Sequence, residues 1–178
     1  MPEPHTVFLL SPARLDGKRA SLLLRQNAGG ALAERIRTPG GAEIGDVFSF
    51  ISQLYFRGKL ACARSFGPTA GVHAGISSTS IITTDGGLVP AATRVAFPDL
   101  EAMAVVDAHV HEPRFVEPPA ADAKQLAGML AGGDRMVLLG SIAGDKYVRP
   151  WLAALAAVAK VTSDRARALN WYHCGVKG

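Results

Sequence analysis

Short runs of apolar residues alternate along the chain with longer amphipathic or polar segments. Three runs of five or six residues show little polar alternation, which is typical of strands buried on both faces of a sheet. We therefore predict buried strands at residues 6–10, 102–107 and 135–139.

Two further segments have the composition of strands. Residues 77–84 are rich in Ser, Thr and Ile and close on Asp85-Gly86-Gly87, which predicts a strand followed by a turn. A short edge strand is expected at residues 93–97.

Helical periodicity is clearest in the first third of the chain. Four apolar residues between Val47 and Leu54 recur at the i, i+3, i+4, i+7 spacing, which predicts a helix that Asp46 caps. Gly58 is expected to interrupt this helix, with another turn or two following up to Phe66. Further helices are expected at residues 19–25, 31–37, 120–130 and 151–160, and an irregular segment at 109–119, which holds three prolines.

The order of these elements predicts an α/β fold. We expect a single three-layer domain over residues 1–178, with a mostly parallel central sheet and helices on both faces. A less ordered C-terminal extension at residues 161–178 is the alternative for that end. Ligands bind such sheets beyond the carboxyl ends of the strands. The loops expected to form the site follow Leu10, Thr84, Val106 and Leu139.

Positive charge is unevenly distributed along the 178 residues. The chain has 19 Lys and Arg against 15 Asp and Glu, a net charge of +4. Residues 1–70 hold nine of the cations and five of the acids, so the excess of 9 − 5 = +4 lies in this part. A one-sided excess fits a face that binds a phosphate or carboxylate, and an ordinary solvated surface is the alternative.

No targeting or redox signal stands out. The apolar runs are too short for a signal peptide or a membrane span, so a cytoplasmic location without membrane contact is expected. Cys62 and Cys174 lie far apart and form no C-x-x-C motif, so no structural disulfide is expected. Cys62 reads as a small core residue.

The loop after the first predicted strand has the composition of an anion site at the start of a helix. Its candidate ligands are Ser11, Arg14, Lys18 and Arg19. A Walker-type P-loop is excluded, because Pro12 stands where glycine is required and Arg19 where Ser or Thr is required. A solvated helix start is the alternative.

Two other stretches offer ligand-binding side chains. Tyr55 can stack a base while Arg57 and Lys59 hold its phosphate. The alternative is a helix C-terminus whose dipole the two cations complement. Ser141, in the Gly and Ser loop after residues 135–139, is a candidate to orient the ligand, and a tight turn is the alternative.

Two carboxylates are candidates for a general base that activates water. Asp85 follows the strand predicted at 77–84, and Asp107 ends the one predicted at 102–107. Both are therefore expected at carboxyl ends of strands, where catalytic groups collect in α/β folds. For Asp85, an ordinary turn is the alternative.

The string Asp107-Ala108-His109-Val110-His111 resembles the D-x-H-x-H motif of metal-dependent amidohydrolases. The resemblance implies that His109 and His111, two apart on a strand, bind one metal ion. That family needs a (β/α)8 barrel of about 250 residues. Only 67 residues follow His111 here, with His173 as the sole later histidine, so a coincidence in a polar loop is the alternative.

A second resemblance spans much of residues 6–148. It is carried by Leu10-Ser11-Pro12-Ala13 with Gly17-Lys18-Arg19, by residues 54–60 and by residues 137–141. These stretches look like a group of uncharacterised bacterial α/β proteins, similar in outline to small nucleobase- or nucleoside-handling domains, including uracil-glycosylase-like ones. The water-activating and histidine motifs of the glycosylases are not recognisable in the chain.

Three functional hypotheses follow. The leading one is a protein that binds a nucleotide, nucleobase or nucleic acid and, if catalytic, is a hydrolase or transferase at a glycosidic or phosphate ester bond, without a cofactor. The rival is a non-catalytic interaction protein that docks or forms homo-oligomers through its apolar C-terminal helix. The third is a metal-dependent hydrolase built on His109 and His111.

Overall fold

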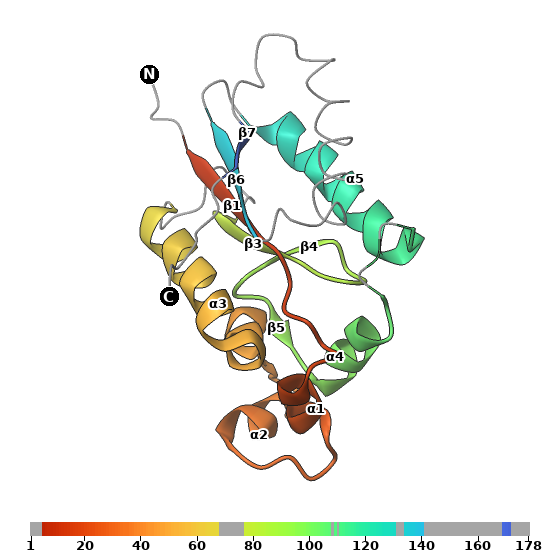
Figure 1. Cartoon of the computed structure of the whole chain (residues 1–178). Helices are drawn as coiled ribbons and strands as arrows, with labels where there is room; N and C mark the ends of the chain where they lie inside the picture. Colours follow the sequence, from red (N-terminus) through yellow and green to blue (C-terminus); the bar gives the residue numbers. More distant parts are fainter. Residues whose placement is uncertain are drawn as a thin grey trace.

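The computed structural model describes residues 5–67, 77–107, 109, 111–130, 134–140 and 169–171. Its largest sheet has five strands in the order β4-β3-β1-β6-β7 (Figure 1). They are β1 (Thr6–Leu10), β3 (Thr79–Ile82), β4 (Leu88–Pro90), β6 (Arg135–Leu139) and β7 (Leu169–Trp171). β4 pairs antiparallel with β3 and the other pairs are parallel, so this is an α/β protein with a mixed, mostly parallel sheet.

β1 lies in the middle of the sheet, and the chain visits its two neighbours in turn. Between β1 and β3 come α1 (Lys18–Leu24), α2 (Ala31–Arg37) and α3 (Ile44–Phe66), whereas α4 (Phe97–Ala104) and α5 (Pro113–Met129) precede β6. The direction of travel across the sheet therefore reverses at β1, and such switch points are where open α/β sheets bind ligands. The Ser11 N–H donates to Leu139 O at 3.0 Å, so the carboxyl ends of β1 and β6 lie side by side.

Each face of the sheet has its own apolar core, because successive strand residues point to opposite sides. Phe8 and Leu10 pack in one cluster with α1, α2 and α3. Val7 and Leu9 pack in the other, with Phe115 and further residues of α5. Burial on both sides explains why β1 and β6 are unbroken apolar runs.

Several sequence predictions are confirmed within a residue or two. The strands expected at 6–10 and 135–139 are β1 and β6, and the helices expected at 19–25 and 31–37 are α1 and α2. The strand and turn expected at 77–87 are β3 and its connection to β4.

The strand predicted at 102–107 is wrong, because this run is the end of α4 and the turn after it. Pro98 stands in the first turn, and Asp99 Oδ2 accepts the N–H of Ala96 at 2.7 Å, which starts a helix just before the run. Met103 is buried, whereas Val105 is 73% exposed. A continuous apolar run therefore did not distinguish a strand from a half-buried helix.

The irregular segment predicted at 109–119 is also wrong from Pro113 on, where α5 begins. Proline suits a first turn because that N–H needs no helical acceptor. Pro118 and Pro119 lie inside the helix and remove two donors. The helix is retained because its apolar side, including Phe115, is buried against the sheet.

The edge strand predicted at 93–97 forms outside the central sheet. It is β5 (Arg94–Val95), which pairs antiparallel with β2 (Ala42–Glu43) in a separate two-stranded sheet. The helix expected at 151–160 lies outside the described residues. Beyond it, β7 pairs in parallel with β6, so part of the segment 161–178 belongs to the central sheet. In the described part of the chain, no helix is long and apolar enough to span a membrane.

α3 (Ile44–Phe66) differs from its prediction at Asp46, the expected cap, and at Gly58, the expected interruption. It begins at Ile44, so Asp46 lies in its first turn rather than at its cap, and Gly58 does not interrupt it. The break comes at Gln53, whose φ of 50° and ψ of −129° are non-helical. This conformation favours glycine and is strained for a residue with a side chain.

A protein with Gly at position 53 should therefore be more stable than one with Ala, although Ala normally has the higher helix propensity. We expect Gln53→Gly to exceed Gln53→Ala by about 1 kcal/mol in free energy of unfolding, because both lose the amide and only Ala retains the strain. Urea unfolding of the two variants measures the difference. Ala at least as stable as Gly, as in an ordinary helix, would contradict the strain.

Candidate functional site

A cleft of about 360 Å³ lies beyond the carboxyl ends of β1 and β3. It is lined by Pro12–Asp16 after β1, by Thr84 after β3, and by Met103–Asp107 at the end of α4. In Figure 1 the segment after β1 passes α4 before it enters α1. Residues at three of the four expected positions thus meet, although the segment at Val106 follows a helix and not the strand predicted there. The volume falls in the range of small-molecule sites.

A hydrogen bond joins two walls of the cleft, and the cleft lies next to the strand ends of the central sheet. Thr84 Oγ1 donates to Met103 O at 2.6 Å, which ties the loop after β3 to α4. Two further hollows in the described part of the chain, of about 440 and 500 Å³, lie around the α1–α2 connection and between α2 and the start of α4. Neither is lined by residues that directly follow a strand of the central sheet.

Arg14 lines the cleft, but Asp16 already occupies its guanidinium. Nε and Nη2 of Arg14 donate to the two carboxylate oxygens of Asp16 at 3.0 and 2.6 Å. Both side chains are exposed, so the pair adds little stability. A phosphate would use the same planar donor edge, so Asp16 competes with any anion for Arg14.

Ser11 and Lys59 form a buried pair at the end of β1. Lys59 Nζ donates to Ser11 O and to Ser11 Oγ, each at 2.8 Å. Both residues are only 4% exposed. The ammonium also lies 4.8 Å from the ring centroid of Tyr55 and 4.9 Å from that of Phe56. Two oxygens and two rings therefore hold the amine in one place.

The environment of Lys59 disfavours its charge. Burial lowers the pKa of Lys59 from 10.5 to about 8, because the amine leaves water for a mostly apolar surrounding. An appreciable fraction of a group with this pKa is neutral near physiological pH, and a neutral amine can accept a proton.

Gly140, the first residue after β6, allows Ser11 its position. A Cβ on Gly140 would lie 2.6 Å from Ser11 Oγ and 2.7 Å from Ser11 Cβ. Such distances are sterically forbidden, so the hydroxyl fits only because this residue has no side chain. The residue after β6 thus contributes to the site because, as a glycine, it leaves room for the Ser11 side chain. Ser141, the ligand predicted there, lies outside the described residues.

The predicted group of Tyr55, Arg57 and Lys59 divides between two sides of α3. Tyr55 and Lys59 are four residues apart and contact each other, whereas Arg57 is two residues from both and faces elsewhere. Lys59 is buried in the middle of α3, which continues to Phe66, so the helix C-terminus alternative is wrong as well.

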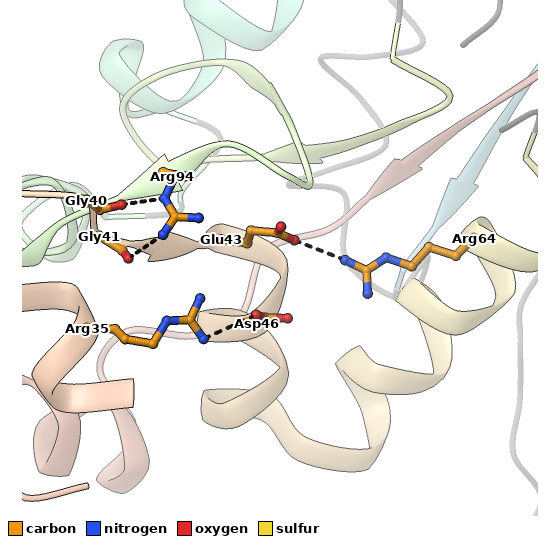
Figure 2. A network of polar contacts seen from close by, with 7 residues as sticks. All are labelled: Arg35, Gly40, Gly41, Glu43, Asp46, Arg64 and Arg94. Carbon is orange, nitrogen blue, oxygen red and sulfur yellow. Dashed lines mark hydrogen bonds and ion pairs between the residues drawn. The ribbon is translucent and has the colours of Figure 1, made fainter. Parts of the chain in front are cut away.

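Most cations of residues 1–70 are used within the fold. Arg35 pairs with Asp46 at 3.8 Å and joins α2 to α3, and Arg64 pairs with Glu43 at 3.4 Å and joins α3 to β2. Figure 2 shows both ion pairs. Of the predicted phosphate ligands, Arg19 donates to Phe50 O at 3.2 Å and stacks on its ring. The cations held in these ways are Arg14, Arg19, Arg35, Arg37, Lys59 and Arg64. Lys18, Arg25 and Arg57 are exposed, so the positive excess is largely structural.

The two candidate general bases have different surroundings. Asp107 is exposed and lines the cleft. Asp85 does not line it; among the described residues its Oδ1 is buried with no hydrogen-bond partner. Burial raises the pKa of Asp85, and nearby Asp99 adds to this. Asp107 is therefore better placed to meet a ligand in the cleft.

The two histidines of the D-x-H-x-H string lie in the turn before α5 rather than on a strand. His111 N–H donates to His109 Nδ1 at 3.3 Å, and the ring centroids are 5.2 Å apart. In the part of the chain that the structure describes, no three His, Cys, Asp or Glu side chains gather as metal ligands. The strand geometry on which the metal hypothesis depended is wrong.

Sequence reasoning missed the partners of the residues it singled out. Asp16 lies two residues after Arg14 in the same loop, whereas Gly140 beside Ser11 carried no local signal. The pairing of Lys59 with Ser11 spans 48 positions. The spacing of four between Tyr55 and Lys59 was the one pattern that indicated a shared helix face.

Comparisons with protein-family models, curated proteins and solved structures find no match for the chain. The resemblance to nucleobase-handling domains therefore stays a prediction.

Proposed function

We propose that the protein binds a small anionic ligand of the nucleotide or nucleobase class in the cleft beyond β1 and β3. The cleft itself carries this proposal, since it joins the loop after β1, Thr84 after β3 and the end of α4 at the carboxyl edge of the mostly parallel sheet. We further propose that the chain forms a single three-layer domain, with α5 on one face of the sheet and α3 on the other.

Each wall of the cleft has a role in this proposal. Arg14 holds a phosphate or carboxylate, and the side chains of Met103 and Val105 provide an apolar surface for a base. Asp107 accepts a hydrogen bond from the ligand or, in a hydrolase or transferase acting on a glycosidic or phosphate ester bond, activates water as a general base.

Ligand-induced stabilisation tests the proposal directly. AMP, UMP, uracil and inorganic phosphate at low salt should be compared by thermal shift, because a ligand that binds only the folded state raises the melting temperature. We expect a nucleotide to raise it more than phosphate does. If none of the probes, nor a short single-stranded DNA, shifts the transition, the proposal is overturned.

Substitutions of Arg14 and of Asp16 should change the affinity for a nucleotide in opposite directions. Asp16→Asn should tighten binding of the nucleotide several-fold because it removes the carboxylate charge that competes for Arg14, whereas Arg14→Gln should weaken it about tenfold. Lys18→Gln, which removes one exposed charge outside the cleft, is the control for net charge. Isothermal titration measures all three. Equal weakening by Lys18→Gln and Arg14→Gln would show a diffuse charge effect instead of a site.

A further inference from the structure

We infer that Ser11 and Lys59 form a serine–lysine pair in which Ser11 Oγ is a nucleophile toward carboxylic esters or amides and Lys59 Nζ is its base. This inference does not depend on the proposed nucleotide ligand. It rests on the contact between the two side chains, their burial and their place at the end of β1.

The contact has the geometry that proton transfer needs. Nζ and Oγ are 2.8 Å apart, within the range in which a base takes a proton from a hydroxyl. The second contact, from Nζ to Ser11 O at 2.8 Å, uses an N–H and leaves the lone pair of a neutral amine free to face Oγ. The amine is thus oriented as well as near.

The charge state of the amine suits a base. Burial lowers the pKa of Lys59 to about 8, so the neutral form is present near neutral pH and predominates above pH 8. The titratable group that faces Nζ from its own helix is the Tyr55 phenol ring. From β1 the amine meets uncharged Ser11, and among the described residues no carboxylate pairs with it to restore the ammonium form.

The pair lies directly behind the Pro12 wall of the cleft and does not itself line it. Ser11 follows the central strand at the switch point of the sheet, and the next residue, Pro12, is the first wall residue of the cleft. Gly140 provides the space in which Oγ sits. Both side chains are 4% exposed, which keeps the amine partly neutral, so the reaction requires the Pro12 wall to admit the substrate and then one water molecule to Ser11 Oγ.

The chemistry of the pair selects an uncharged reacting centre. A neutral Lys59 adds no positive charge beside Ser11, so the pair suits an acyl carbon better than a phosphate dianion. Ser11 Oγ bonds to the carbonyl carbon while its proton moves to Nζ. The leaving alcohol or amine then takes that proton as its bond to carbon breaks. Water next attacks the acyl-Ser11, passes a proton through Nζ back to Oγ, and releases the carboxylic acid.

Covalent labelling with a small alkyl fluorophosphonate tests the inference on the whole chain. We expect one adduct by intact mass, located at Ser11 by peptide mapping, with a labelling rate that rises with pH around a midpoint of about 8. With p-nitrophenyl acetate we expect a burst of nitrophenolate that matches the protein concentration.

Variants separate the roles of the two residues. Ser11→Ala should abolish labelling and the burst. Lys59→Arg keeps a cation that cannot act as a base, and should slow labelling at pH 8 by about 100-fold. Ser21→Ala, which removes an exposed hydroxyl on α1, is the matched control and should label like the unmodified protein.

The outcomes that overturn the inference are independent of variant folding. They are no labelling of the folded wild-type chain between pH 7 and 9.5, an adduct at another residue, or a labelling rate without a rise near pH 8. Because nucleotide binding is measured separately by thermal shift, failure of the nucleophile and failure of the proposed ligand site give different patterns.

Discussion

Lys59→Met should remove a rise of about 3 kcal/mol in the free energy of unfolding that the wild-type protein shows between pH 8 and 10.5. Folding lowers the pKa of Lys59 from 10.5 to about 8. Below pH 8 the folded protein must keep a buried amine charged, which costs about 3 kcal/mol at 1.36 kcal/mol per pKa unit. Methionine removes this cost but leaves the buried Ser11 O and Oγ without their amine donor, at roughly 1–3 kcal/mol for each, so the expected effect lies in the pH dependence and not in the stability at pH 7.

The same shift predicts a pH dependence with a definite sign. Between pH 8 and 10.5 the unfolded chain binds a proton at Lys59 that the folded chain does not, so wild-type stability rises through this window by about 3 kcal/mol from this group. The contribution of Lys59 is flat below and above it. Lys59→Met lacks the rise, so the difference between the two stability curves should change by about 3 kcal/mol across the window.

Urea unfolding at half-unit pH steps measures both curves. The informative quantity is the difference between wild type and Lys59→Met, because titrations of other groups cancel. Lys18→Met, which alters an exposed lysine, should follow the wild-type profile. Parallel profiles for wild type and Lys59→Met would show that Lys59 is not desolvated in the folded protein.

Gly140→Ala should destabilise the protein by about 3 kcal/mol, the upper end expected for overpacking a core. The new Cβ would fall 2.6 Å from Ser11 Oγ and 2.7 Å from Ser11 Cβ. Ser11 cannot move aside freely, because its N–H bonds Leu139 O and its carbonyl and hydroxyl bond Lys59. The substitution should also break the contact between Ser11 and Lys59 and so abolish labelling of Ser11.

Gly58→Ala is the matched control for Gly140→Ala. Gly58 lies within α3, and a Cβ there meets nothing within 4 Å. We expect it to stabilise the protein by up to about 1 kcal/mol through helix propensity. Chemical unfolding compares the two variants. A Gly140→Ala variant as stable as Gly58→Ala would show that the carboxyl ends of β1 and β6 are not closely packed.

The elements that could be predicted are those whose own sequence carries a complete signal. Each of the four buried positions of β1 and of β6 holds an apolar residue, as expected for strands covered on both faces. Glycine precedes α2 and proline follows it, which marks both of its ends. The run at 102–107 failed because half-buried helices and buried strands can have the same short apolar composition. α5 formed across Pro118 and Pro119 because burial against the sheet outweighed a local preference.

For the site, too, the sequence indicated which residues are chemically capable but not which contacts they make. Local sequence was sufficient to name Ser11, Arg14, Lys59 and Asp107 as chemically capable and to place the site at the carboxyl ends of the strands. Only the tertiary structure decided that Lys59 reaches Ser11 beside Gly140, whereas Arg14 and Asp16 meet within one loop, two residues apart. The physical reason is that side-chain chemistry belongs to each residue, whereas burial, charge state and partners arise from chain segments that folding brings together over long sequence distances.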